Sequence, residues 1–186
     1  MQFHFDPFPV LTSPRLRLRK IESFDAGEIF AFRSDPAVMK YIDRPLMRDL
    51  EEANIFIQKI NSDLHTNSGI TWGITLKEDN KLVGTIGFWK MDPENFRAEI
   101  GYMLRADLRG KGFTQEALSV VLQFGFAVLN LHSVEANANP ANEASIKLLE
   151  KNGFAREGYF RENYFFDGRF LDSAVYSLIN SGSEHT

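Results

Sequence analysis

Apolar and polar positions change their period several times along the chain, and each period predicts a type of element. Charged and apolar residues alternate at 15–21, which is the period of a half-buried strand. Residues 25–34 and 49–67 have the spacing of amphipathic helices, and an irregular segment at 35–45 separates them. Three further segments alternate like strands and are joined by tight turns, at 70–77, 81–91 and 97–105. This arrangement predicts an antiparallel meander.

The second half of the chain opens with a different helix pattern. Residues 115–130 are apolar on almost every face, which predicts a helix buried against a sheet. A strand is predicted at 132–138, followed by a helix with Pro140 in its first turn and Gly153 at its end. Two more strands complete the pattern, at 154–166 and 170–179, and a turn at Asp167-Gly168 joins them. Helices that alternate with a mostly antiparallel sheet predict an α/β, or α+β, domain of three layers.

The composition predicts a single domain. Of the 186 residues, 44% are hydrophobic and 17 are phenylalanine, which is enough for one sizeable core. We expect one domain over 1–186, with a folded core at about 11–179 and a disordered polar tail at 181–186. The chain contains no cysteine, which excludes disulfides, thiol nucleophiles and zinc–thiolate sites.

The charge argues against a nucleic-acid-binding surface, because the net charge is −4 and the pI is near 5.6. One basic cluster alternates along the first strand and predicts a solvated strand face, at Arg15, Arg17, Arg19 and Lys20. The four histidines are scattered, so no metal site is expected. No basic leader opens the chain, and the longest uncharged apolar stretch, 117–131, is too short to span a bilayer. These features predict a cytoplasmic protein.

A short glycine-containing segment, Arg109-Gly110-Lys111-Gly112-Phe113-Thr114, lies between the third meander strand and the buried helix. Glycines let the backbone approach a ligand closely, so successive N–H groups can converge on phosphate at the positive end of the next helix. Thr114 is the predicted N-cap, and Glu116 in the first turn suits the helix dipole. The segment fits neither a Walker loop nor the dinucleotide fingerprint, which needs a glycine at Gln115. Alone, it is better explained as an ordinary strand-to-helix turn carrying a solvated lysine.

Further motifs surround this segment in a characteristic order. Glu99-Ile100-Gly101-Tyr102-Met103-Leu104 precedes it, while Asn139 to Ser145 and Leu148 to Phe154 follow it. The first strand is preceded and opened by Leu11-Thr12-Ser13-Pro14-Arg15-Leu16-Arg17-Leu18-Arg19. Together these motifs resemble the GNAT acyltransferase superfamily, and more narrowly its ribosomal-protein alanine N-acetyltransferase (RimJ/RimL-like) branch. The resemblance extends to about Leu178.

This resemblance implies the GNAT fold, in which a mostly antiparallel central sheet with helices on both faces splits around the acetyl-CoA cleft. Acetyl-CoA would be the cosubstrate, with no metal. The strand backbone that would pair with the pantetheine amides belongs to Gly101, Tyr102, Met103 and Leu104. The N–H groups that would hold the pyrophosphate belong to Gly110, Lys111, Gly112, Phe113 and Thr114. The family pattern [QR]-x-x-G-x-[GA] matches Arg109 and Gly112, and departs at Thr114, which is larger than glycine or alanine.

Acetylation of an amine requires positioning and the removal of a proton, and a carboxylate near the amine is the expected base. The resemblance makes Glu99 the first candidate, because it stands at the frequent glutamate of the E-I-G-Y pattern. An alternative interpretation of Glu99 is a charged residue on the solvent side of its strand. Glu162, in Tyr159-Phe160-Arg161-Glu162, is the alternative base.

The leaving thiolate needs a proton, which many GNAT enzymes supply from a tyrosine at the position of Leu149 in this chain. That departure leaves Ser145, one turn earlier, or a water molecule as the donor, as in the RimJ/RimL-like branch. Asn142 would hydrogen-bond the cofactor or a water near the thioester. Ser145 and Asn142 are also compatible with the simpler role of beginning a helix.

The leading functional hypothesis is an acetyl-CoA-dependent N-acetyltransferase that acts on a protein or peptide N-terminal amine. A small-molecule amine or amino-acid acetyltransferase is the alternative within the enzyme class, and a non-catalytic acyl-CoA-binding sensor is the alternative outside it. The segment 39–48 would contact the acceptor. The aromatic residues are expected mostly in the core. The phenylalanine-rich hairpin at 154–179 predicts an apolar surface that either pairs subunits in a homodimer or forms part of the acceptor cleft.

Overall fold

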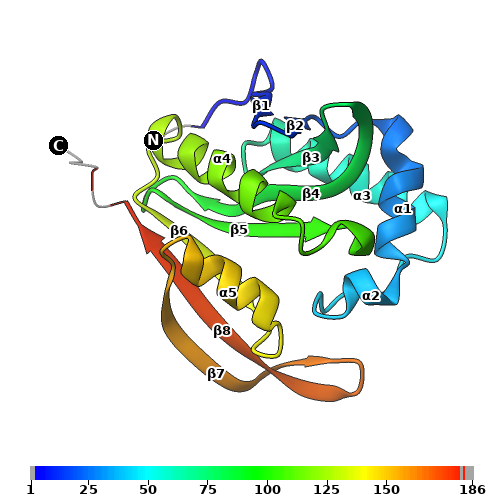
Figure 1. Ribbon diagram of the computed structural model, residues 1–186. Coiled ribbons are helices and arrows are strands. Elements are labelled where there is room, and N and C mark those ends of the chain that lie inside the picture. Colours follow the sequence, from blue (N-terminus) through cyan, green and yellow to red (C-terminus); the bar gives the residue numbers. More distant parts are fainter. Residues whose placement is uncertain (1–2, 181, 183–186) are drawn as a thin grey trace.

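One eight-stranded sheet runs through the protein in the computed structural model, which describes residues 3–180 and residue 182. Its strand order is β1-β2-β3-β4-β5-β6-β8-β7 (Figure 1). Neighbouring strands are antiparallel except β5 and β6, which are parallel. The strands span Leu11–Thr12 (β1), Leu16–Arg19 (β2), Ile70–Leu76 (β3), Asp79–Asp92 (β4), Arg97–Leu104 (β5), Ser133–Ala138 (β6), Ala155–Phe166 (β7) and Arg169–Ile179 (β8). The predicted meander is β3, β4 and β5.

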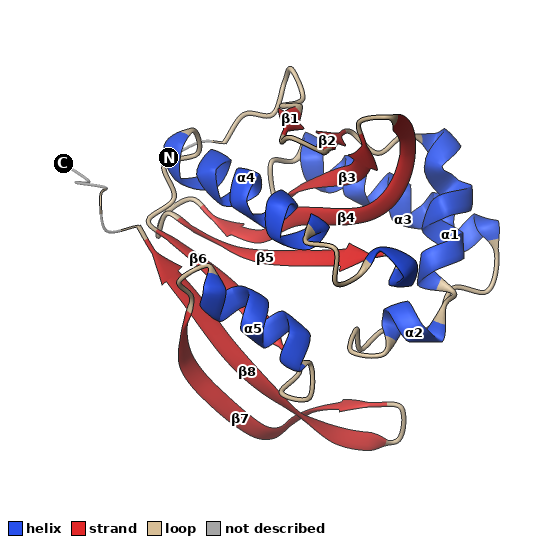
Figure 2. Ribbon diagram, viewed as in Figure 1, coloured by secondary structure: helices blue, strands red, loops and turns tan. Residues whose placement is uncertain are grey.

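Helices cover both faces of this sheet (Figure 2). They span Ala26–Arg33 (α1), Pro36–Met39 (α2), Leu50–His65 (α3), Phe113–Ala127 (α4) and Glu143–Lys151 (α5), with 3₁₀ turns at Ser23–Asp25 (η1) and Ala106–Leu108 (η2). Two adjacent residues of β5 mark the two faces: Leu104 lies in the larger core with α4, and Met103 lies in the smaller core with α1 and α3. The predicted α/β domain of three layers is confirmed.

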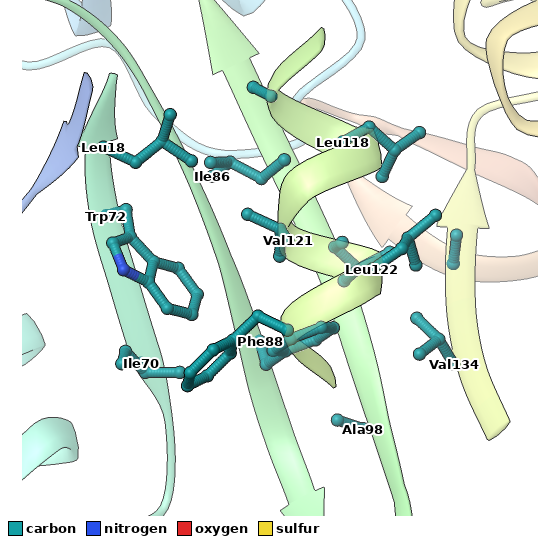
Figure 3. Close-up of a cluster of buried hydrophobic side chains, with 14 of the residues drawn as sticks. Leu18, Ile70, Trp72, Ile86, Phe88, Ala98, Leu118, Val121, Leu122 and Val134 are labelled. Atoms are coloured by element: carbon teal, nitrogen blue, oxygen red, sulfur yellow. The ribbon is translucent and has the colours of Figure 1, made fainter. Parts of the chain in front are cut away.

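The larger core contains three aromatic rings that meet edge to face. The centroid of Trp72 lies 6.3 Å from that of Phe88 and 5.4 Å from that of Phe124. Figure 3 shows Trp72 and Phe88 between the strands and α4. At Gly125 of α4, an added Cβ would stand 2.7 Å from the Phe88 ring, so only glycine permits this close approach. This packing fixes α4, and therefore the loop at its start, against β4.

Not every aromatic residue follows the expectation of burial. Trp89, Phe160 and Phe165 are exposed, because β7 is an edge strand and Trp89 is next to an irregularity in β4. The turn at Asp167-Gly168 lies where it was predicted, and both of its residues have positive φ, as a two-residue hairpin turn of this kind requires.

The sheet opens between β5 and β6. Their parallel pairing covers only three positions, Arg97 with Ser133, Ala98 with Val134 and Glu99 with Glu135. Beyond them, Ile100–Leu104 pairs only with β4, and Ala136–Ala138 pairs only with β8. Figure 1 shows the two strands diverging from this point. The predicted split in the sheet is therefore present, and Glu99 lies at its apex.

Several predicted boundaries are wrong for local reasons. Helix α4 begins at Phe113, and its N-cap is Gly112 rather than Thr114. Helix α5 begins at Glu143, because the Asn142 side chain accepts a hydrogen bond from the Ser145 N–H at 3.2 Å and caps it there, so Pro140 precedes the helix. The segment predicted as irregular contains α2, which Asp35 caps by accepting a hydrogen bond from the Ala37 N–H.

The predicted solvated face of the first strand is also wrong at Arg19. Its guanidinium is buried and donates to both carboxylate oxygens of Asp25, at 2.7 and 2.8 Å, and to the side chain and carbonyl of Asn80. Alternation alone cannot distinguish such a pair from a solvated face, since Asp25 lies outside the strand.

The tail predicted at 181–186 falls outside the described residues, apart from Gly182. Over the described part of the chain, no helix is long and apolar enough to cross a membrane. The single-domain boundaries stay a prediction.

Candidate active site

The segment Arg109–Thr114 runs from the end of η2 into the first turn of α4. Gly110 and Gly112 have φ of 74° and 80°, a left-handed conformation that strains any residue with a Cβ. In residues 3–180, no protein group accepts a hydrogen bond from the N–H groups of 110–115. Unpaired N–H groups at the positive end of a helix form an anion-binding site. The loop therefore has the property that a pyrophosphate needs.

Arg15 braces this loop from the first strands, which corrects its prediction as a merely solvated residue. Its Nη1 donates to the Lys111 carbonyl at 3.1 Å, its Nε donates to Glu116 at 2.7 Å, and its guanidinium lies over the Phe113 ring. Glu116 also accepts from the Ser13 hydroxyl at 2.6 Å. Burial raises the pKa of Glu116, but the hydrogen bonds from Ser13 and Arg15 outweigh it and the net pKa is lowered. Glu116 thus stays ionised and holds the loop in place.

The Arg109 side chain turns away from the loop. Its two terminal nitrogens donate to the carbonyls of Ala37 and Val38 at 2.9 and 3.0 Å. Arg109 therefore ties the loop to α2, and its guanidinium is already hydrogen-bonded within the protein.

Glu99 lies at the apex of the split and is only 5% exposed, so the interpretation of a solvent-facing residue is wrong. Its Oε2 accepts from the Nζ of Lys90 at 2.7 Å, whereas the Lys90 side chain is 65% exposed. Lys90 has a φ of 45°, beside a register shift in β4 between Trp89 and Asp92. A strained backbone thus directs an amine onto a buried carboxylate.

Ser145 meets a side chain to which the sequence analysis gave no role, that of Tyr102. The hydroxyls of Tyr102 on β5 and Ser145 on α5 are 2.7 Å apart, across the split. Burial raises the pKa of Tyr102, although the hydrogen bond with Ser145 lowers it, so the phenol keeps its proton at neutral pH. The alternation of β5 could have revealed Tyr102, because it shares a face with Ile100 and Leu104, toward α4.

The remaining predicted residues lie apart from this group. Glu162 is exposed at an irregularity of β7, and its N–H donates to Asp172 at 2.7 Å. The last residue of β6, Ala138, pairs with Ala174 of β8, whereas Phe160 of β7 pairs with Ser173, which is nearer to the hairpin turn. Glu162 therefore lies farther along the hairpin, away from the apex of the split. Met103 and Leu104 end β5, with their side chains buried and no strand along the edge that faces the split.

One hydrogen bond joins the outer part of the hairpin to the segment that follows α2. The Tyr164 hydroxyl on β7 donates to the carboxylate of Asp43, which lies in the segment predicted to contact the acceptor. Burial and the negative charge of Asp43 both raise the pKa of Tyr164. The segment 39–48 and the hairpin are thereby linked.

The comparisons with known proteins agree with this geometry. A family model described as Acetyltransferase (GNAT) domain matches residues 15–155. The chain belongs to the GNAT acetyltransferase family. It is 40% identical over 169 residues to "Uncharacterized N-acetyltransferase p20" of Bacillus licheniformis, covering 91% of this chain and 95% of that one. It is 38% identical over 172 residues to "Uncharacterized N-acetyltransferase YoaA" of Bacillus subtilis (strain 168), covering 92% and 97%.

Solved structures support the same assignment. The GNAT-family acetyltransferase from Bacillus anthracis has a TM-score of 0.82 and 30% identity, covering 92% of this chain and 98% of that one. The ribosomal L7/L12 acetyltransferase RimL in complex with coenzyme A has a TM-score of 0.85 at 19% identity, which supports the fold alone. The GNAT fold and an acyltransferase activity are confirmed, and the RimJ/RimL-like branch stays a prediction.

The residues present fit acetyl-CoA, because the split offers an unpaired strand edge and the loop offers unpaired N–H groups. In the described ranges, no group of three His, Cys, Asp or Glu side chains is placed to hold a metal ion.

We predict that Gly112→Asp weakens CoA binding severely, because it brings a carboxylate against the bound pyrophosphate. Lys111→Ala should weaken it only modestly, since an exposed charge is screened. Calorimetric titration with CoA measures both effects.

The matched control is Gly168→Asp, at a glycine of similar φ, 76°, in the distant hairpin turn. It should bind CoA like the wild type. Equal CoA affinity for Gly112→Asp and the wild type would contradict the loop assignment.

Proposed function

We propose that this GNAT enzyme transfers an acetyl group from acetyl-CoA to a primary amine, with the N-terminal amine of a protein or peptide as its acceptor. The observation that carries the proposal is the buried Glu99 carboxylate, which binds an ammonium group, that of Lys90, at the apex of the split. An acceptor ammonium offers the same charge and the same hydrogen-bond donors. It can therefore replace Lys90 at Glu99.

A relative supports the protein acceptor. The chain is 34% identical over 101 residues to "Putative ribosomal N-acetyltransferase YdaF" of Bacillus subtilis (strain 168), over 54% of this chain and 55% of that one. Another relative favours the small-molecule alternative: spermidine N(1)-acetyltransferase of Escherichia coli (strain K12), 23% identical over 143 residues. The non-catalytic sensor is disfavoured, because it gives no role to Glu99 or to the Tyr102–Ser145 pair.

In this proposal acetyl-CoA, when bound, supplies a thioester-activated acetyl group, and the chain positions it. The N–H groups of 110–115 bind the pyrophosphate, and the open edge of 101–104 pairs with the pantetheine amides. The Asn142 side chain, already used as the cap of α5, accepts from the Ser145 N–H and so fixes the backbone that carries the Ser145 hydroxyl.

Glu99 then acts as the base. It takes a proton from the acceptor ammonium, and the neutral nitrogen forms a bond to the acetyl carbon as the carbon–sulfur bond breaks. The acylated nitrogen then loses its second proton to solvent and becomes the neutral amide. Lys90 must first leave Glu99, and its mostly exposed side chain can do so at little cost, because solvent stabilises its charge.

Ser145 gives a proton to the leaving sulfur. Its hydroxyl then takes the proton of Tyr102, at 2.7 Å, and solvent restores Tyr102. In the family the donor is often a tyrosine at the position of Leu149, which here is buried in the core. The phenol of Tyr102 replaces it from the opposite side of the split.

We predict that Glu99→Gln keeps CoA affinity and lowers turnover by about two orders of magnitude at neutral pH. Activity should recover partly at high pH, where more of the acceptor amine is already neutral. The measurement is thiol release against pH.

The control is Glu135→Gln, which stands in register with Glu99 but bonds Arg97 instead. It should keep most of its turnover. If Glu99→Gln retained full activity while Glu162→Gln lost it, the base would lie on the hairpin and the assignment would be wrong.

We predict that Ser145→Ala and Tyr102→Phe each lower kcat by about tenfold, a smaller effect than at Glu99 because water can also protonate a thiolate. The double variant should be no slower than the slower single variant, since both residues act in one relay. Tyr159→Phe, which removes a hydroxyl from the exposed hairpin, serves as the control. If the losses of kcat in the two single variants multiplied in the double variant, Tyr102 and Ser145 would act independently, and the relay would be wrong.

The acceptor is tested with a panel measured at saturating acetyl-CoA. We predict the highest kcat/KM for a peptide with a free N-terminal alanine or serine, above the same peptide blocked at its N-terminus, free amino acids and spermidine. A higher value for spermidine or an amino acid would favour the small-molecule alternative. Tight CoA binding without thiol release for any amine would favour the sensor.

A further inference from the structure

A cavity of about 630 Å³ lies outside the split and shares no residue with the acetyl-CoA loop. It is bounded by the end of α1, the segment that follows α2, and the first half of α3. Its lining residues are Arg33, Arg44, Pro45, Leu46, Met47, Arg48, Glu52, Ile55, Phe56 and Lys59. The volume falls in the range of small-molecule sites.

The positive charges of this cavity are unequally compensated. Arg48 donates through Nε to Glu52 at 2.7 Å, and Lys59 pairs with Asp63 at 2.9 Å. Arg44 donates only to a backbone carbonyl, that of Asp43, at 2.8 Å. Arg33 pairs with no carboxylate among the described residues. Two guanidinium charges, on Arg33 and Arg44, therefore remain without a partner of opposite sign.

Arg33 is the more constrained of the two. Its Nε is buried and donates to no group in the described chain, and its guanidinium lies over the Phe56 ring at 4.2 Å. Burial lowers the pKa of Arg33, and the nearby charge of Arg44 lowers it further. A buried donor without a partner is costly, and proteins rarely retain one unless a ligand, an ion or a water molecule completes it.

We propose that this cavity binds a small ligand with a carboxylate or phosphate joined to an apolar group. Arg33 and Arg44 contact the anionic oxygens, since guanidinium groups match both anions through paired N–H donors. Phe56, Ile55 and Leu46 receive the apolar part, and the last two are exposed at 57% and 40% without it. A polycation such as spermidine is repelled here.

The anion has two possible sources, the acceptor itself or a separate effector. The cavity adjoins the acceptor end of the split, because Arg44 follows Asp43, which bonds Tyr164. The positive charge of Arg44 also acts on the Tyr164 hydroxyl, where it opposes the rise of that pKa. The binding chemistry is the same for both sources.

The test is calorimetry on the full chain saturated with CoA, which fills the phosphate loop. The probes are phenyl phosphate, benzoate and inorganic phosphate, with spermidine as the negative probe. Saturable binding of at least one anion is expected, and Arg33→Gln should weaken it by about tenfold or more. Arg48→Gln, in the same cavity but already compensated by Glu52, should change it by no more than about twofold.

Arg44 is exposed, so Arg44→Gln provides the same test if Arg33→Gln disturbs folding. The proposal is overturned if no anion binds the wild type saturably, or if Arg33→Gln and Arg44→Gln both bind like the wild type. CoA affinity should be equal in every variant, so failure here leaves the acetyl transfer untouched.

Turnover distinguishes the two sources. If Arg33→Gln raises the KM of an acidic peptide but not of its neutral analogue, the acceptor carries the anion. If it leaves both KM values unchanged while abolishing anion binding, the ligand is a separate effector.

Discussion

The loss of pairing between β5 and β6 after Glu99 is the constraint on which the rest of the structure depends. Three parallel pairs hold the two halves of the sheet together, and beyond them each strand is paired on one side only. A continuous sheet would bury this edge and leave no room for a ligand between α4 and α5. The opening instead leaves Glu99 at its apex and lets the Tyr102 hydroxyl on β5 meet that of Ser145 on α5.

The structure supports this opening from outside. Arg15 and Ser13 hold the α4 loop through Glu116, Arg109 ties the same loop to α2, and Asp43 bonds Tyr164 on the hairpin. These contacts connect the loop before α4 to the hairpin through α2 and the segment that follows it. A phosphate loop built on backbone N–H groups needs such bracing, because its affinity depends on geometry rather than on mobile charges.

Local signals predicted most of the fold and part of the site. Period-two alternation identified β3 to β5, and the glycines predicted the loop before α4, where Gly110 and Gly112 have positive φ, since both features are encoded over a few neighbouring residues. The Arg19–Asp25 pair, the Arg15 brace and the Tyr102–Ser145 contact were missed. In each contact, tertiary packing brings together residues that are far apart in the sequence or belong to different elements. From the sequence alone, the charged side chains among them are equally compatible with a solvated position. The start of α5 was predicted too early, because the Asn142 side chain caps the helix after Pro140.

The central claim is that acetyl-CoA occupies the split with its pyrophosphate on the start of α4. Backbone amide NMR shifts during a CoA titration test it most directly. The account predicts saturating shifts and slowed amide exchange at 110–115 and 101–104, with residues 167–168 of the hairpin turn unchanged. Saturable CoA binding that leaves the amides of 110–115 unperturbed would contradict it.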